Sequence, residues 1–354
     1  MVLVILFGFV VAQALPEKDN ADETSGIQTF AEKEDEQENG LVIEYVTGNR
    51  LIKEKEIIRI PTPSPAETVS VDATEKEIPA GGRVSEYTPI CYPKLSEIIG
   101  EKYLVENLMN LEYLKEHFYI VNATTKMTET DFDAEYFLSK DLSIEPGEGE
   151  EPQILIYHTH GSEGFIDSRA GNSEDTVVGV GEILAEILRE KYGYRVLHDT
   201  TLFDKKDGKD NRNYAYSDAL PYIETLLEEH PSIEVVIDLH RDAGAKRVVS
   251  IGDKQVAKVM LFNGLCRNTK GEKLSYLPNE NLEDNLAFSF QMKLIGDEMY
   301  PGLMNKIFLK DYRYNMHLME RYLLIELGTE QNTVEEAKNA MEPLADILFQ
   351  VLGR

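Results

Sequence analysis

Two histidines and a glutamate stand close together in the stretch ILIYHTHGSEGF, at residues 154–165. His158, His160 and Glu163 follow four apolar residues whose pattern is typical of a buried strand. The chain has only seven histidines, so two at one strand end are an unusual concentration. Because imidazole and carboxylate groups are common zinc ligands, this stretch is a candidate for one half of a metal site.

Two further apolar runs also end in polar residues. The stretch VVIDLHRD ends with His240, Arg241 and Asp242, and the stretch YLLIELG contains Glu326 near its end. A buried polar group without a partner costs about 1–3 kcal/mol, so packing alone does not explain these positions. Ligand sites of open parallel sheets lie beyond the carboxyl ends of the strands. We therefore expect the three strand ends to meet at one site.

These residue types fit a catalytic zinc site, which has three protein ligands and one open position for water. His160 and Glu163 form the close pair of ligands, and His240 is the distant third. Glu326 is then the general base that activates water for attack on an amide. Each residue alone also has a structural explanation: a hydrogen-bonded strand end for His240, a turn cap for Glu326 and a core position for His158.

Several assignments stay open. Glu174 is a rival acidic ligand, although an acid just before a helix usually serves the helix N-terminus. Arg241 is a candidate for holding an oxyanion or a substrate carboxylate, or else forms a surface ion pair with Asp242. Arg313 and Asn315 are weaker candidates for substrate contact, in a segment that otherwise is typical of a loop.

The elements that must position these residues alternate along the chain. Strands that alternate with helices of this length predict an α/β domain with a mixed, mostly parallel sheet flanked by helices. A hairpin is expected around Gly252 and Asp253. The predicted strands are 153–158, 194–199, 234–240, 306–309 and 322–327, and the predicted helices are 176–193, 218–231, 281–299 and 334–352.

The chain before this domain has a different composition. Residues 1–15 carry no charged side chain and predict a membrane anchor or a signal segment. Residues 16–93 predict an acidic, proline-containing linker that is mostly disordered. Residues 94–150 have apolar side chains at helical spacing and predict a small helical lead-in that packs on a catalytic domain at 151–354.

The formal net charge of −28 excludes whole classes of partner. A nucleic-acid-binding protein needs a basic face for phosphate, and adsorption to anionic lipid needs the same. The two cysteines, Cys91 and Cys266, cannot form a disulfide framework or a cysteine zinc site.

The motifs resemble the stage II sporulation protein P family of endospore-forming bacteria. The similar stretches are ILIYHTHGSEGF, VVGVGEIL, YGYRVLHDTT, VVIDLHRDA, MLFNG and LLIELGTEQNTVEEA, in the order that the family has. The resemblance covers about residues 115–354 and implies a fold like that of zinc exopeptidases and amidases. In cell-wall amidases the acidic ligand lies at the start of the first helix, which favours Glu174 over Glu163.

The resemblance also implies an activity and a setting. It implies a zinc-dependent N-acetylmuramoyl-L-alanine amidase that cuts stem peptides from peptidoglycan during engulfment, with an additional action on cross-links. The implied partners are peptidoglycan, a lytic transglycosylase of stage II sporulation and the cell membrane. The catalytic domain would then lie outside the cytoplasm, held by one N-terminal anchor or secreted if that segment is cleaved. The alternatives are a zinc carboxypeptidase acting on free peptides and a catalytically dead cell-wall binding module.

Overall fold

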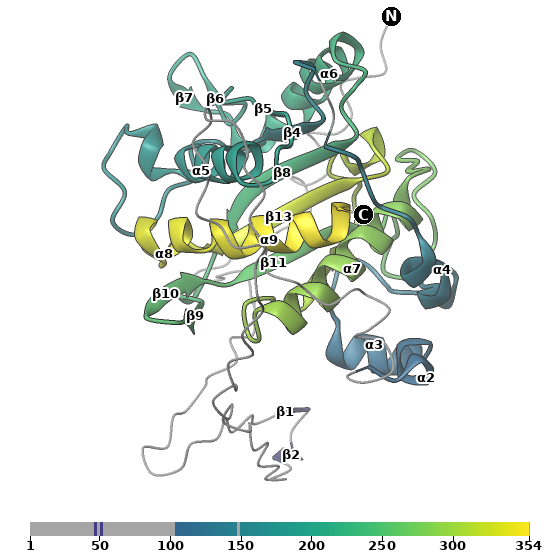
Figure 1. Ribbon diagram of the computed structural model, residues 1–354. Helices are drawn as coiled ribbons and strands as arrows, with labels where there is room; N and C mark the ends of the chain where they lie inside the picture. Colours follow the sequence, from purple (N-terminus) through teal and green to yellow (C-terminus); the bar gives the residue numbers. More distant parts are fainter. Residues whose placement is uncertain (1–45, 48–49, 52–102, 147–148, 354) are drawn as a thin grey trace, which may run out of the picture. The chain divides into compact units, whose positions relative to one another are not determined.

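The computed structural model (Figure 1) describes residues 46–47, 50–51, 103–146 and 149–353. The chain divides into two compact units, Met1–Ala80 and Gly81–Arg354. In the first unit, the structure describes one antiparallel pair, β1 (Val46–Thr47) with β2 (Arg50–Leu51). The predicted anchor at 1–15 and nearly all of the predicted linker lie outside the described residues.

A seven-stranded sheet forms the centre of the second unit, with the order β3-β12-β11-β13-β8-β4-β5. Neighbouring strands run parallel except for the pair β11 and β13, so the predicted mixed, mostly parallel sheet is confirmed. The strands are β3 (Tyr119–Val121), β4 (Ile154–Tyr157), β5 (Val196–His198), β8 (Val235–Asp242), β11 (Val259–Gly264), β12 (Ile307–Lys310) and β13 (Tyr322–Thr329).

Helices cover both faces of this sheet, which explains why its central strands are apolar on both sides. Ile154 and Ile156 of β4 lie in the core shared with α5 (Val177–Glu190), α7 (Leu282–Met299) and α9 (Met341–Leu352). Leu155 and Tyr157, which alternate with them, lie in the core on the other face against α6 (Ala215–Glu229). The result is a three-layer arrangement of helix, sheet and helix.

Two local predictions have different outcomes. The hairpin around Gly252 is confirmed, because β9 (Val248–Ile251) pairs antiparallel with β10 (Lys254–Ala257) and Gly252 takes a φ of 60°. The single helix predicted for 334–352 is wrong, since α8 (Val334–Asn339) ends before α9 begins. Pro343, which lacks an N–H, fits the first turn of α9 but not the middle of one long helix.

The predicted helical lead-in supplies more than helices. Between α3 (Leu111–His117) and α4 (Ala134–Ser139) lies β3, which extends the sheet by pairing with β12. Phe118 and Phe137 pack on Phe290 of α7, with ring centroids 5.3 and 5.6 Å away. The lead-in therefore contributes one strand to the sheet and packs on the helix α7 that covers it.

Smaller elements complete the unit. These are α2 (Val105–Leu108), the short pair β6 (Lys205–Lys206) and β7 (Lys209–Asp210), and four 3-10 turns at 129–131, 173–175, 212–214 and 316–318. In the ranges that the structure describes, no helix is both long and apolar enough to cross a membrane.

Candidate active site

The predicted residues of three strands come together because β4, β8 and β13 are neighbours in the sheet and run parallel. His160 follows the end of β4, and His240 lies near the carboxyl end of β8. Glu326 of β13 is the register partner of His240. The carboxyl ends of these strands therefore form one edge, as expected for an open parallel sheet.

Glu163 and the two imidazoles lie side by side at this edge. The Oε2 atom of Glu163 is 3.6 Å from Nδ1 of His240, and both side chains are almost fully buried. The rings of His160 and His240 are 5.3 Å apart and nearly perpendicular. The turn after β4, closed by the Glu163 amide donating to the His160 carbonyl at 3.1 Å, brings Glu163 back towards His240.

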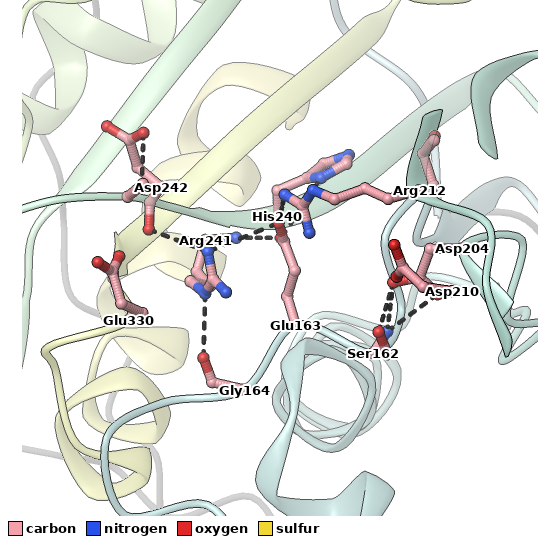
Figure 2. Close-up of polar contacts among 12 residues, drawn as sticks. Ser162, Glu163, Gly164, Asp204, Asp210, Arg212, His240, Arg241, Asp242 and Glu330 are labelled. Carbon is pink, nitrogen blue, oxygen red and sulfur yellow. Dashed lines mark hydrogen bonds and ion pairs between the residues drawn. The ribbon is translucent and has the colours of Figure 1, made fainter. Parts of the chain in front are cut away.

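Cationic groups surround Glu163 (Figure 2). Arg212 forms an ion pair with Oε1, and the backbone N–H of Arg241 donates to Oε2 at 3.0 Å. Burial opposes ionisation, but His240 and the two arginines outweigh it and lower the pKa of Glu163 to about 2. Sequence reasoning missed Arg212, because it lies in the turn before α6 with no motif or strand end to mark it.

Arg241 does not form the surface ion pair with the Asp242 carboxylate that was its alternative role. Its guanidinium lies 3.7 Å from Glu163 and donates through Nε to the carbonyl of Gly164 at 3.0 Å. The Asp242 carboxylate pairs instead with Arg247 at 2.7 Å. Arg241 is thereby held beside the candidate ligands (Figure 2).

Asp238 lies beside Nε2 of His240, the ring nitrogen that faces away from Glu163. Its Oδ1 atom lies 2.7 Å from Nε2 of His240, as an ion pair without good hydrogen-bond alignment. Thr159 donates to the same carboxylate through its N–H at 2.8 Å and its hydroxyl at 2.6 Å. Burial would lower the pKa of His240, but Asp238 and Glu163 outweigh burial and raise it well above its usual range.

Three buried polar atoms of the site have no hydrogen-bond partner among the residues described. They are Nδ1 of His160, Oε2 of Glu326 and Nε2 of His240, which faces Asp238 as an ion pair. Burial, with the charges of Glu163 and Asp242, raises the pKa of Glu326 to about 8 although His240 and Arg241 oppose this. Burial, His240 and Arg212 lower the pKa of His160 to about 4. Shifted groups of this kind concentrate at functional sites.

The donor set has the right chemistry for zinc but is not assembled as a metal cage. Within the described part of the chain, no three histidine, cysteine, aspartate or glutamate side chains are grouped closely enough to hold a metal ion. Still, His160, Glu163 and His240 supply two imidazoles and a carboxylate, and Nδ1 of His160 is an unused donor atom. A metal ion at this edge would compete with Arg212 for the Glu163 carboxylate. The residues fit a zinc ion in chemical type.

His158 belongs to a second, buried group of histidines. Its Nδ1 lies 2.8 Å from the Leu239 carbonyl, and its Nε2 lies 2.9 Å from Nε2 of His198. Nδ1 of His198 is in turn 2.6 Å from Glu182 on α5. Burial and the neighbouring His198 lower the pKa of His158 to about 3. His158 is therefore a hydrogen-bonded core residue, and its partner His198 was not foreseen from the sequence.

The remaining candidates lie in other surroundings. The Glu174 side chain is 78% exposed and lies 3.6 Å from Arg169, while Glu163 is the acid beside His240. Arg313 donates to the Pro278 carbonyl at 3.2 Å, and Asn315 donates to the Tyr216 carbonyl at 3.0 Å. The first contact joins two loops, and the second joins the loop of Asn315 to α6.

Comparisons with known proteins identify relatives over most of the chain. The family described as Stage II sporulation protein P (SpoIIP) matches residues 69–349. "Stage II sporulation protein P" of Bacillus subtilis (strain 168) is 27% identical over 220 residues, which cover 57% of this chain. The match covers 52% of that protein, so this chain spans about half the length of the relative.

Solved structures of amidases have a distant likeness to the chain. N-acetylmuramoyl-L-alanine amidase AmiC2 of Nostoc punctiforme is 14% identical with a TM-score of 0.36, over 59% of this chain and 100% of that one. An N-acetylmuramoyl-L-alanine amidase from Clostridium difficile 630 is 13% identical with a TM-score of 0.34, over 57% and 96%. At these TM-scores the likeness adds nothing to the assignment of the site.

Proposed function

The chain belongs to the stage II sporulation protein P family, and from this premise we propose that it is a peptidoglycan hydrolase. The bond cleaved in this proposal is the amide between N-acetylmuramic acid and the L-alanine of the stem peptide. The observation that carries the proposal is the meeting of His160, Glu163 and Glu326 around His240 at the end of adjacent parallel strands.

We propose that His160, Glu163 and His240 hold a zinc ion. The low pKa of Glu163 keeps it ionised and the low pKa of His160 keeps it neutral, which are the forms that bind a metal. The pKa of His240 is raised, so zinc would have to displace the proton of that imidazole. Asp238 behind His240 is an outer carboxylate of the kind that orients metal-bound imidazoles. Zinc, when bound, supplies a Lewis acid for the amide carbonyl and lowers the pKa of water.

Glu326 is the proposed general base. Its Oε2 atom is buried and unpartnered within the described chain, and it faces the same edge as His240. A carboxyl group with a pKa of about 8 is a stronger base than an ordinary carboxylate, so in its ionised form it can take a proton from water and release it to the leaving amine. Arg241, fixed beside Glu163, is the proposed partner of an oxyanion or a substrate carboxylate.

The setting of the reaction is part of the same proposal. A stage II sporulation lytic transglycosylase, a membrane anchor at residues 1–15 and a catalytic domain outside the cytoplasm follow from the family resemblance. Cleavage of cross-links and a role in engulfment follow from the same source. These features rest on the family resemblance and on the composition of the N-terminal residues.

Product analysis tests this function. The zinc-loaded chain is incubated with purified peptidoglycan, and the soluble products are separated and weighed by mass spectrometry. An amidase releases intact stem peptides and leaves bare glycan. A carboxypeptidase shortens the stems from their ends, and a dead binding module releases nothing. Either of the last two results would replace the proposed function.

A further inference from the structure

A row of aromatic rings leads away from the candidate active site. The ring of Tyr216 lies 5.6 Å from that of His160, and the ring of Tyr314 lies 5.4 Å from Tyr216. Tyr312 follows at 6.3 Å from Tyr314, and its side chain is 49% exposed. The row therefore connects the buried imidazoles with the surface.

The loop that carries Tyr312 and Tyr314 is held in an unusual conformation. Tyr314 and Asn315 have φ angles of 49° and 59°, in the left-handed region that side chains other than glycine rarely adopt. A Cβ atom on Gly264 would collide with the Tyr312 carbonyl and lie 2.9 Å from the Tyr314 ring. This position of β11 therefore requires glycine. Asn315 fixes the loop to α6 through the Tyr216 carbonyl, at 3.0 Å. Strain that packing maintains in this way is typical of binding sites.

A second exposed ring lies in the loop that Arg313 contacts. Tyr276 is 56% exposed and comes two residues before Pro278. Arg313, which follows Tyr312 in the chain, donates to the Pro278 carbonyl at 3.2 Å. This hydrogen bond joins the loop that carries Tyr312 to the loop that carries Tyr276.

Charged groups of both signs contact Tyr314. The Lys310 ammonium lies 5.9 Å from the centre of the Tyr314 ring, and the Tyr314 hydroxyl donates to Asp311 at 3.3 Å. A ligand that carries charge would meet both signs here. The surface suits a neutral ligand with a flat apolar face and hydroxyl groups.

We propose that Tyr312 and Tyr276 form a subsite for a pyranose ring of a glycan strand, and that Tyr314 and Tyr216 line the way from it to the candidate active site. Aromatic rings stack on the apolar face of a sugar, and phenol groups bond its hydroxyls. This inference rests on the proposed function, since an enzyme that cuts the amide next to a sugar must hold the glycan beside its catalytic groups.

Binding of a glycan without stem peptides tests the subsite. N-acetylchitotetraose is titrated into the full chain in the presence of a chelator, and affinity is measured by calorimetry or ligand-observed NMR. Tyr312→Ala and Tyr276→Ala should each weaken binding about tenfold, the size expected for one lost stacking contact. Tyr312→Phe should keep most of the affinity. Tyr222→Ala is the control. It removes a tyrosine of α6 that is 41% exposed, and it should leave the affinity for the tetrasaccharide unchanged.

The result separates this inference from the proposed function, because binding is measured without zinc and without cleavage. Failure of the tetrasaccharide to bind at millimolar concentration would overturn the subsite. So would an unchanged affinity in Tyr312→Ala and Tyr276→Ala. A stem tripeptide is the second probe, and loss of its binding alone in the two variants would assign the rings to the peptide instead.

Discussion

Glu163 lies where the groups of the candidate site meet, between His240, Arg212 and the N–H of Arg241. Sequence spacing predicted it together with His160 and His240, because each follows or ends an apolar strand. It could not separate Glu163 from Glu174, since Glu163 follows the strand end whereas Glu174 lies at the start of the first helix, where cell-wall amidases have their acidic ligand. Folding separates them, because one is buried and the other is 78% exposed.

Zinc content distinguishes these two acids. Glu163→Gln should lose zinc, because a three-ligand site that loses its carboxylate retains little affinity. Glu174→Gln, the matched control, should keep the metal because its side chain faces solvent beside Arg169. Metal is measured by mass spectrometry after dialysis against a weak chelator. Loss of zinc from Glu174→Gln with retention in Glu163→Gln would exchange the two roles.

Two groups that the sequence did not reveal act through partners that are distant in sequence. Arg212 comes from a turn before α6 and reaches Glu163, and His198, at the end of β5, meets His158. Arg212 has no neighbour in sequence with which it forms a motif, and the motif that contains His198 does not indicate its partner. Their roles follow from tertiary contacts, which spacing along the chain does not encode.

At the level of elements, the contact between α5 and the histidines of the sheet depends on Gly181. A Cβ atom there would lie 2.7 Å from Cε1 of His158 and 3.0 Å from Nε2 of His198. Both rings are fixed by hydrogen bonds, to the Leu239 carbonyl and to Glu182, so they cannot move aside. The glycine is therefore required by a close approach rather than by its backbone angles.

Gly181→Ala tests this contact because two effects oppose each other. Alanine in a helix is favoured over glycine by about 0.5–1 kcal/mol, whereas overpacking a core costs about 1–3 kcal/mol. We expect the steric effect to prevail and the free energy of unfolding to fall, as measured by urea titration. Glu186→Ala on the exposed side of the same helix is the control and should change stability by under about 0.5 kcal/mol. A stabilised Gly181→Ala would show that the histidine rings can shift.

At the level of the whole molecule, the order of the strands in the sheet is the feature that the sequence predicted least. Alternating helices and strands predicted the mostly parallel sheet correctly. The antiparallel pairing of β11 with β13 and the edge strand β3 depend on contacts between distant segments. Such contacts are decided by packing of complete faces, such as the Phe118 and Phe290 rings, and not by local pattern.

The contribution of the lead-in segment can be measured by shortening the chain. A chain that begins at Lys94 should fold. A chain that begins at Glu151 lacks β3, so β12 loses its hydrogen-bonded neighbour on that side. The shorter chain also lacks Asp131, so Arg267 loses its ion-pair partner. Thermal unfolding of the two chains should show a clearly lower midpoint for the shorter one. Equal midpoints would make the lead-in an independent segment.

The central claim is that one site, formed by His160, Glu163, His240 and Glu326, hydrolyses the muramoyl amide. Glu326→Gln tests it most directly, because the amide has the same shape as the carboxylate but cannot accept a proton. Stem peptides released from purified peptidoglycan are quantified for this variant and for the unaltered chain, with zinc content measured in both. We predict full zinc content and a loss of release of about 10²–10⁴-fold, the range for a general base. Release at the unaltered rate by a folded, zinc-loaded Glu326→Gln would contradict the account.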